Sequence, residues 1–205
     1  MTGSIATERM LLRRFTDADL DWLAALHGDP RVMRYIDDGL PVTRPVVADE
    51  TLPAILREYG ELPDGLGYLA AAEQAGGRPL GWFALRPPSS IGLDHASSDT
   101  AELGYRLFPA AWGRGYATEG ARALVRHAFS DLRLERVVAT TMTVNVASRR
   151  VLEKSGLSLV RTFYRQWPTY IAGAEHGDVV YEIARQDLRP GYQPSSRSRS
   201  SPMPK

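Results

Sequence analysis

The stretch WGRGYATEG, residues 112–120, decides how the rest of the chain is interpreted. It places three glycines and an arginine at the start of a segment whose apolar residues recur at helical spacing. The first amides of a helix have no partner within it, and the helix dipole is positive at that end. Glycine also lets an anion approach the backbone without meeting a Cβ atom. The stretch therefore predicts a site for a phosphate or pyrophosphate at a helix start.

Three familiar explanations compete for these glycines. A tight turn that needs positive φ occurs in many proteins and implies no ligand. A dinucleotide fingerprint requires a third glycine where Thr118 stands, and Pro109–Ala111 separates the motif from its strand. A phosphate loop requires Lys and Ser or Thr where Ala121 and Arg122 stand. Because both nucleotide motifs are incomplete, these residues alone predict an anion site without naming its ligand.

The surrounding segments indicate an α+β (mixed α/β) domain. Residues 100–108, TAELGYRLF, alternate apolar and polar side chains as a half-buried strand does, and Gly104 within them predicts a bulge or a close backbone approach. A β-branched run at 136–144 predicts a buried strand between two helices, one from residue 116 and one over 145–155. Further strands are expected at 8–15, 67–75, 79–86, 157–166 and 179–185, and further helices at 16–27, 31–36 and 44–59, the last containing Pro53.

Length and charge define one folded unit and a tail. The 205 residues, 43% of them hydrophobic, suffice for one substantial core, so we expect a single domain over residues 1–188. Residues 189–205 carry four basic residues and no acidic one, and their Ser and Pro content predicts a disordered basic tail. Without the tail, 21 basic residues face 24 acidic ones, so the folded unit lacks the positive excess of a nucleic-acid-binding surface.

Several residue patterns are absent, and their absence narrows the function class. The chain has no cysteine, which excludes thiol nucleophiles, disulfides and thiolate metal ligands. No window approaches the about 18 apolar residues of a membrane span, and the histidine spacing does not match a metal site. We therefore expect a cytoplasmic protein, a monomer or homodimer, with no metal and with no nucleic-acid or membrane partner.

Three segments taken together, AELGYRLFP, AAWGRGYATE and NVASRRVLEKSGL, resemble the acetyl-CoA-binding core of the GNAT superfamily of N-acetyltransferases. The loop fits the family pattern Gln/Arg-x-x-Gly-x-Gly/Ala except at its first position, which holds Trp112. Trp followed by Tyr-Ala-Thr-Glu is similar to the branch of ribosomal-protein N-terminal acetyltransferases, the RimJ/RimL-like proteins. The resemblance is strong over residues 102–157 and looser over 8–188. It implies a central, mostly antiparallel, splayed sheet flanked by helices.

The resemblance also implies acetyl-CoA as cosubstrate and assigns residues to it. The pyrophosphate is expected on the amides of the glycine loop, and the pantetheine arm beside the preceding strand and next to Asn145. Asn145 also suits the N-cap of its helix, and the two roles are compatible. The expected cofactor-binding residues are Tyr105, Arg106, Leu107, Trp112, Gly113, Arg114, Gly115, Tyr116, Ala117, Thr118 and Asn145.

Acetyl transfer to an amine needs a base, polarisation of the thioester carbonyl and a proton for the departing thiolate. With no cysteine, a cysteinyl acyl-enzyme is excluded, and direct attack in a ternary complex is the simplest route. Glu102 stands where many family members carry the base, although a solvated strand charge is the competing interpretation. Leu152 stands where many relatives carry a proton-donating tyrosine, and leucine cannot donate. Ser148, on the helical face of Asn145, is the alternative acid. The competing interpretations are that Ser148 is an ordinary serine of the first helical turn and that water supplies the proton.

The acceptor stays open between a small-molecule amine and a protein N-terminus. A non-catalytic acyl-CoA-binding sensor or interaction module is the alternative that Leu152 favours. A third hypothesis is an RNA-associated protein that acts through the tail, residues 189–205. The glycine loop followed by the Asn145 and Ser148 pair favours the N-acetyltransferase.

Overall fold

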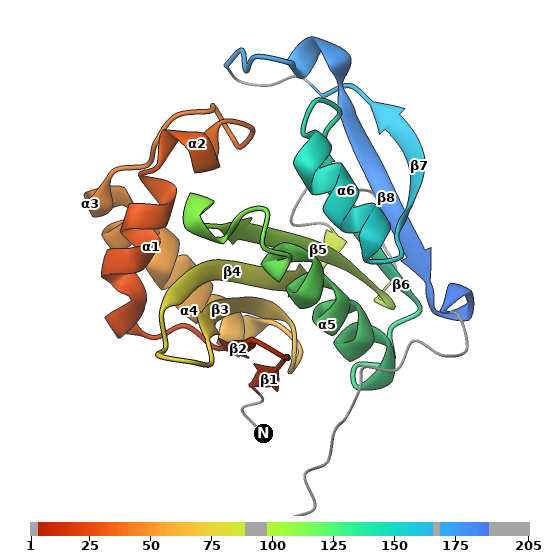
Figure 1. Ribbon diagram of the computed structural model, residues 1–205, viewed down its shortest axis with the longest axis horizontal. Coiled ribbons are helices and arrows are strands. Elements are labelled where there is room, and N and C mark those ends of the chain that lie inside the picture. The colour runs from red at the N-terminus through yellow and green to blue at the C-terminus, as the bar shows by residue number, and fades with distance from the viewer. Residues whose placement is uncertain (1–3, 89–97, 166–168, 189–205) are drawn as a thin grey trace, which may run out of the picture.

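The computed structural model describes residues 4–88, 98–165 and 169–188, and the predicted tail lies outside this part of the chain. The described residues form an eight-stranded sheet in the order β1-β2-β3-β4-β5-β6-β8-β7, with helices against it (Figure 1). The strands are β1 Ile5–Ala6, β2 Met10–Arg13, β3 Gly67–Glu73, β4 Pro79–Arg86, β5 Thr100–Leu107, β6 Arg136–Met142, β7 Ser158–Phe163 and β8 Asp178–Ala184. The helices are α1 Leu20–His27, α2 Pro30–Met33, α3 Arg44–Val46, α4 Leu52–Glu61, α5 Tyr116–Ser130 and α6 Val146–Lys154.

Strands β5 and β6 run parallel, whereas the other neighbouring strands of the described sheet pair antiparallel. The parallel pairing joins residues 100–102 to residues 136–138 and then stops. Beyond it, β5 continues to Leu107 with β4 alone, and β6 continues to Met142 with β8 alone. The two strands therefore diverge, which confirms the predicted mixed α/β fold with a mostly antiparallel, splayed sheet.

Apolar side chains fill both faces of the sheet, because neighbouring residues of a strand point to opposite sides. On one face, Leu103 and Leu107 of β5 join a buried cluster that includes Leu124 of α5. On the other face, Trp82 of β4 packs in a second cluster with residues of α1 and α4, among them Leu23. Helices α1 and α4 thus cover one face and α5 the other (Figure 1).

The first residues of the helix predicted over 16–27 tie α1 to strand β2. The Asp19 carboxylate, in a residue only 2% exposed, accepts hydrogen bonds from the Thr16 amide and the Trp22 indole, both at 2.8 Å. Arg13 of β2 donates two more, at 2.7 and 2.8 Å. Burial raises the pKa of Asp19, but the hydrogen bonds from Arg13, Trp22 and Thr16 outweigh it and lower the pKa to about 2.

The helix predicted over residues 44–59 forms despite Pro53, with a change of helix type. A π-helical segment, Val47–Thr51, joins α3 to α4, and Pro53 lies in the first turn of α4. Proline has no amide hydrogen and its ring crowds the preceding turn. A wider turn placed directly before it accommodates both defects, so the chain stays helical from Arg44 to Glu61.

The bulge or close approach predicted at Gly104 is wrong. The β4–β5 register is regular through Ala84 and Gly104, and a Cβ there would meet its neighbours at ordinary distances of 3.6 Å and more. The close backbone approach occurs at Gly81 on the partner strand, where a Cβ would collide with the Arg106 carbonyl. A Cβ on Gly104 would instead make ordinary contacts with Trp82 and Glu102, on the same face of β5.

We predict that Gly120→Ala destabilises the fold by about 1–3 kcal/mol, since overpacking a rigid core costs that much. A Cβ on Gly120 would overlap the fully buried ring of Phe83, so α5 sits as close to β4 as glycine permits. Denaturant unfolding measures the change. Gly60→Ala in α4 is the matched control, because a Cβ there meets nothing within 4 Å. Alanine should raise stability at Gly60 by up to about 1 kcal/mol; a similar gain at Gly120 would contradict the packing argument.

Candidate active site

The loop between β5 and α5 offers a row of unpaired backbone amides. Gly113 and Gly115 have φ values of 69° and 83°, which favour glycine. The Glu119 amide donates to the Gly115 carbonyl at 3.0 Å, whereas the amides of residues 113–118 have no backbone acceptor within the described part of the chain. These amides lie at the positive end of the 15-residue helix α5. The arrangement has the features expected of an anion site.

Trp112 attaches the start of this loop to the end of the strand. Its indole Nε1 donates to the Leu107 carbonyl at 2.8 Å, and the residue is about half exposed. The bond occupies the last carbonyl of β5 and fixes where the loop begins. Trp112 therefore positions the loop through its side chain.

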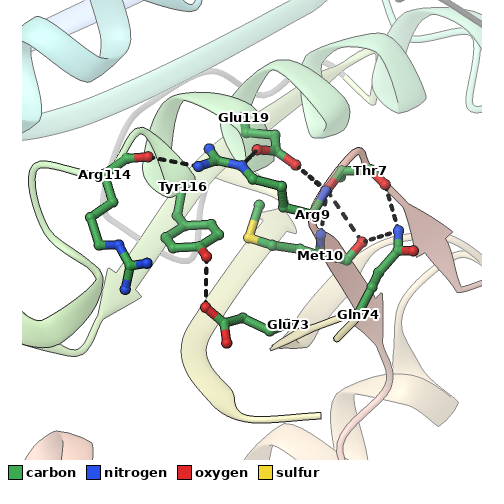
Figure 2. Close-up of polar contacts among 8 residues, drawn as sticks. All are labelled: Thr7, Arg9, Met10, Glu73, Gln74, Arg114, Tyr116 and Glu119. Atoms are coloured by element: carbon green, nitrogen blue, oxygen red, sulfur yellow. Dashed lines mark hydrogen bonds and ion pairs between the residues drawn. The ribbon is translucent and has the colours of Figure 1, made fainter. Parts of the chain in front are cut away.

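Two hairpins from the N-terminal half hold the first turn of α5 (Figure 2). The Glu119 carboxylate accepts from the Thr7 hydroxyl at 2.6 Å, the Arg9 amide at 2.8 Å and Arg9 Nε at 2.7 Å. Arg9 Nη1 also donates to the Arg114 carbonyl at 2.9 Å. Sequence reasoning missed Thr7, Arg9 and Glu119, because more than 100 residues separate the partners.

Tyr116 is held in the same network. Its hydroxyl donates to Glu73 Oε1 at 2.6 Å, and its ring lies 4.4 Å from the Arg9 guanidinium carbon (Figure 2). Arg78 binds the same Glu73 carboxylate, and the bonds from Arg78 and Tyr116 lower the pKa of Glu73 to about 2. The Tyr116 side chain is thus occupied by contacts with Glu73 and Arg9. Its backbone amide is the group that remains free for the predicted cofactor site.

On the α5 and α6 face, Tyr105 reaches from β5 to the start of α6. Its hydroxyl lies 2.9 Å from Ser148 Oγ and 3.2 Å from the Ser148 carbonyl. Burial raises the pKa of Tyr105, so the phenol keeps its proton. Ser148 in turn donates its amide to Asn145 Oδ1 at 3.2 Å, which confirms Asn145 as the N-cap of α6. Three predicted site residues, Tyr105, Asn145 and Ser148, therefore lie together.

Leu152 lies outside this group. The residue is 1% exposed and belongs to the core cluster that contains Leu124 of α5. Its position explains why an apolar residue is tolerated there, and the paired hydroxyls of Ser148 and Tyr105 lie apart from it.

Glu102 points to the opposite face of β5 and is not a solvated strand charge. The residue is 4% exposed, and Arg86 Nη2 donates to its Oε2 at 2.9 Å. Burial raises the pKa of Glu102, and the attraction of Arg86 opposes the shift without cancelling it. Glu102 also occupies the last position of the β5–β6 pairing, so it marks the point where the strands separate.

Arg106 shares that face, and its side chain turns toward α1 and α2. Its Nη1 lies 3.2 Å from His27 Nε2 and 3.3 Å from Met33 Sδ, and its guanidinium carbon lies 5.2 Å from the Trp82 ring centre. Burial lowers the pKa of His27 to about 3, so this imidazole is neutral, and burial also lowers the pKa of Arg106 to about 10. The part of Arg106 that can lie along a cofactor at the open strand edge is therefore its backbone.

In the part of the chain that the structure describes, no helix is long and apolar enough to cross a bilayer. No group of three or more His, Asp and Glu side chains there is arranged to hold a metal ion.

Comparison with known proteins places this geometry in a family. The model of the acetyltransferase (GNAT) domain matches residues 9–158. Over 204 residues the chain is 34% identical to the FsC-acetyl coenzyme A-N(2)-transacetylase of Aspergillus fumigatus, a match that covers 97% of this chain and 84% of that protein.

Solved structures show the same fold. A GNAT-family acetyltransferase from Bacillus anthracis has a TM-score of 0.72 at 21% identity, covering 90% of this chain and 99% of that one. RimL, a ribosomal alpha-N-protein acetyltransferase solved with coenzyme A, has a TM-score of 0.70 at 16% identity, covering 89% of this chain and 98% of its own. Identities this low show a shared fold alone, and the RimJ/RimL-like branch does not follow from them. The family model and the 34% identical relative together show that the chain belongs to the GNAT family of acetyl-CoA-dependent acetyltransferases.

Proposed function

We propose that this protein transfers the acetyl group of acetyl-CoA to a primary amine by direct attack within a ternary complex. The observation that carries the proposal is the divergence of β5 from β6 beyond Glu102. The open edge of β5 leads from Glu102 to the unpaired amides of residues 113–118. A cofactor with an anionic end and an extended arm suits this combination of strand edge and helix start.

The cofactor-binding residues follow from this placement. The diphosphate would lie on the amides of residues 113–118, with Arg114 adding positive charge. The pantetheine arm would run along the backbone of residues 105–107, where β5 lacks a strand partner on that edge. Asn145 uses Oδ1 as a cap, and its side-chain nitrogen Nδ2 has no partner within the described residues, so Nδ2 remains available to the arm. Acetyl-CoA supplies the thioester carbonyl that the amine attacks.

Glu102 is the proposed base. A carboxylate with a raised pKa accepts a proton from an ammonium more readily than an ordinary one does. Glu102 stands where the two strands separate, so it would lie beside the reacting end of a cofactor laid along β5. Arg86 holds the carboxylate by Oε2 and orients it, which supports the assignment.

Ser148 is the proposed acid, with Tyr105 behind it. The serine hydroxyl would protonate the departing thiolate and would take a replacement proton from solvent, while the Tyr105 phenol, 2.9 Å away, would donate a hydrogen bond to the serine oxygen. Because burial keeps the phenol protonated, it can serve as that hydrogen-bond donor. This pair replaces the single tyrosine that Leu152 displaces.

The acceptor is proposed to be a small-molecule amine in preference to a protein N-terminus. The 34% identical relative is named for transfer to an N(2) atom of FsC, which supports an acceptor other than a ribosomal protein. A thiol-release assay over amino acids, polyamines, aminoglycosides and peptides separates the two classes. Release only with peptides would favour the RimJ/RimL-like activity, and release with none of them would favour the non-catalytic sensor.

We predict that Gly115→Val abolishes CoA binding in a calorimetric titration. A β-branched residue at φ 83° is strained, and its side chain would crowd the Arg9 guanidinium, 3.3 Å from the Cβ position. Gly76→Val is the control, since Gly76 has φ 86° and open space around its Cβ position. Both variants strain the backbone by placing valine at positive φ, but only Gly115→Val should fail to bind CoA. If Gly115→Val still binds CoA, the diphosphate lies elsewhere.

We predict that Glu102→Gln lowers kcat by about 10²–10⁴-fold, the usual contribution of a general base, with little change in CoA affinity. Because burial raises the pKa of Glu102, the wild-type kcat should fall on acidification at a pH above the ordinary carboxyl range, as the base becomes protonated. The variant should lose this limb of the pH profile. Glu135→Gln, an exposed carboxylate paired with Arg185, is the control. An unchanged rate for Glu102→Gln would assign the base to another group.

We predict that Ser148→Ala and Tyr105→Phe each lower kcat by up to about 10²-fold, and that combining them adds little, because Tyr105 acts through Ser148. Single-turnover measurements isolate the chemical step from product release. Independent, multiplying losses would show that Tyr105 does not act through Ser148.

A further inference from the structure

We propose that Arg9 is a positioning residue for the CoA diphosphate: it neutralises the Glu119 carboxylate at the start of α5 and holds the Arg114 carbonyl turned away from the ligand. The inference rests on the proposed function, since it assumes that CoA binds at residues 112–118. It adds a residue from the N-terminal hairpin that touches neither the cofactor nor the reacting atoms.

Glu119 presents an electrostatic problem at this site. It lies in the first turn of α5, four residues after Gly115, on the same helix end as the unpaired amides. Burial raises the pKa of Glu119, but the hydrogen bonds from Thr7 and Arg9 lower it by a larger amount. The net pKa is below the ordinary value, so the side chain is an anion. A fixed anion within a turn of a bound diphosphate repels it unless a cation is held beside it.

Arg9 supplies that cation in a fixed geometry. Its Nε lies 2.7 Å from Glu119 Oε2, and its own amide and the Thr7 hydroxyl bind Oε1 at 2.8 and 2.6 Å. Both carboxylate oxygens are therefore turned toward the β1–β2 hairpin. The charge of Glu119 is thus balanced by Arg9, which Figure 2 shows between the Glu119 carboxylate and the Arg114 carbonyl.

The second bond of Arg9 orients the loop itself. Arg9 Nη1 donates to the Arg114 carbonyl at 2.9 Å. In a planar trans peptide the carbonyl and the next N–H point in opposite directions. Because the Arg114 carbonyl faces Arg9, the Gly115 N–H faces away from it, on the side left for a ligand. Arg9 Nη2 also lies beside Gly115, 3.3 Å from the position that a Cβ of this residue would occupy.

The surroundings hold the Arg9 side chain in this double role. The Gln74 amide donates to the Arg9 carbonyl at 2.9 Å, which fixes the backbone of Arg9 against the end of β3. The guanidinium lies over the Tyr116 ring, whose hydroxyl binds Glu73. A planar guanidinium can satisfy a carboxylate, a carbonyl and an aromatic face together, which an ammonium cannot.

The test is a calorimetric titration of CoA into the wild type, Arg9→Gln, Glu119→Gln and the double variant. Arg9→Gln should weaken CoA binding about 10-fold, because it leaves Glu119 uncompensated beside the diphosphate. The double variant should bind at least about 3-fold more tightly than Arg9→Gln, because it also removes the anion. Arg126→Gln, which removes a charge from α5 two turns further along, is the control and should leave the affinity unchanged.

A ligand without the diphosphate separates positioning from general stability. The affinity for pantetheine, measured by titration at millimolar concentration, should be the same in Arg9→Gln and the wild type. If pantetheine weakens as much as CoA, or if the double variant binds no more tightly than Arg9→Gln, the inference is overturned. Wild-type protein that does not bind CoA at all would instead overturn the proposed function.

Arg9→Lys is the second variant and serves if Arg9→Gln shows no cooperative thermal unfolding. Lysine keeps the charge but not the planar fork of the guanidinium. The CoA affinity of Arg9→Lys should therefore fall between those of the wild type and Arg9→Gln. If Arg9→Gln does not fold, the affinity of Arg9→Lys should be about 3-fold weaker than that of the wild type. Affinity equal to the wild type would overturn the role of the Arg114 carbonyl contact. A loss of about 10-fold or more would overturn the role of charge balance.

Discussion

The parallel pairing of β5 with β6 stops after three residues, and the candidate site depends on that interruption. Each strand keeps its antiparallel neighbour on the other side, β4 for one and β8 for the other, so the two halves of the sheet follow separate courses. A continuous sheet would satisfy the backbone of β5 on both edges and leave no polar edge for a ligand. The interruption leaves one edge free without exposing the apolar core.

The pleat of β5 divides the chemistry between two faces. Odd-numbered residues carry Tyr105 toward Ser148 on the α5 and α6 side, and even-numbered residues carry Glu102 toward Arg86 on the α1 and α4 side. The proposed base and acid therefore stand on opposite faces of the strand along which the cofactor would lie. An amine that approaches from one face and a thiolate that leaves on the other would not compete for the same groups.

The glycine loop depends on distant partners as much as on its own residues. Positive φ values at Gly113 and Gly115 shape the turn, but Arg9, Thr7 and Glu73 fix its orientation through Arg114, Glu119 and Tyr116. The β1–β2 and β3–β4 hairpins thus pack against the loop and support it (Figure 2). The orientation of the loop therefore depends on residues far from it in the chain, at positions 7, 9 and 73.

The sequence by itself determined the mixed α/β fold, the order of its elements from β2 onward, the glycine loop before α5 and the cap at Asn145, because strand alternation, helical period and capping are local properties. It also determined that Leu152 cannot donate a proton, since this depends only on residue type. Only the tertiary structure decided that Glu102 is buried against Arg86, that Tyr105 meets Ser148, and that Arg106 turns to His27. The same holds for Arg9 and Glu119, which lie 110 residues apart. These contacts join residues distant in the chain, and burial, charge pairing and hydrogen bonding act through distance in space, which no local pattern encodes.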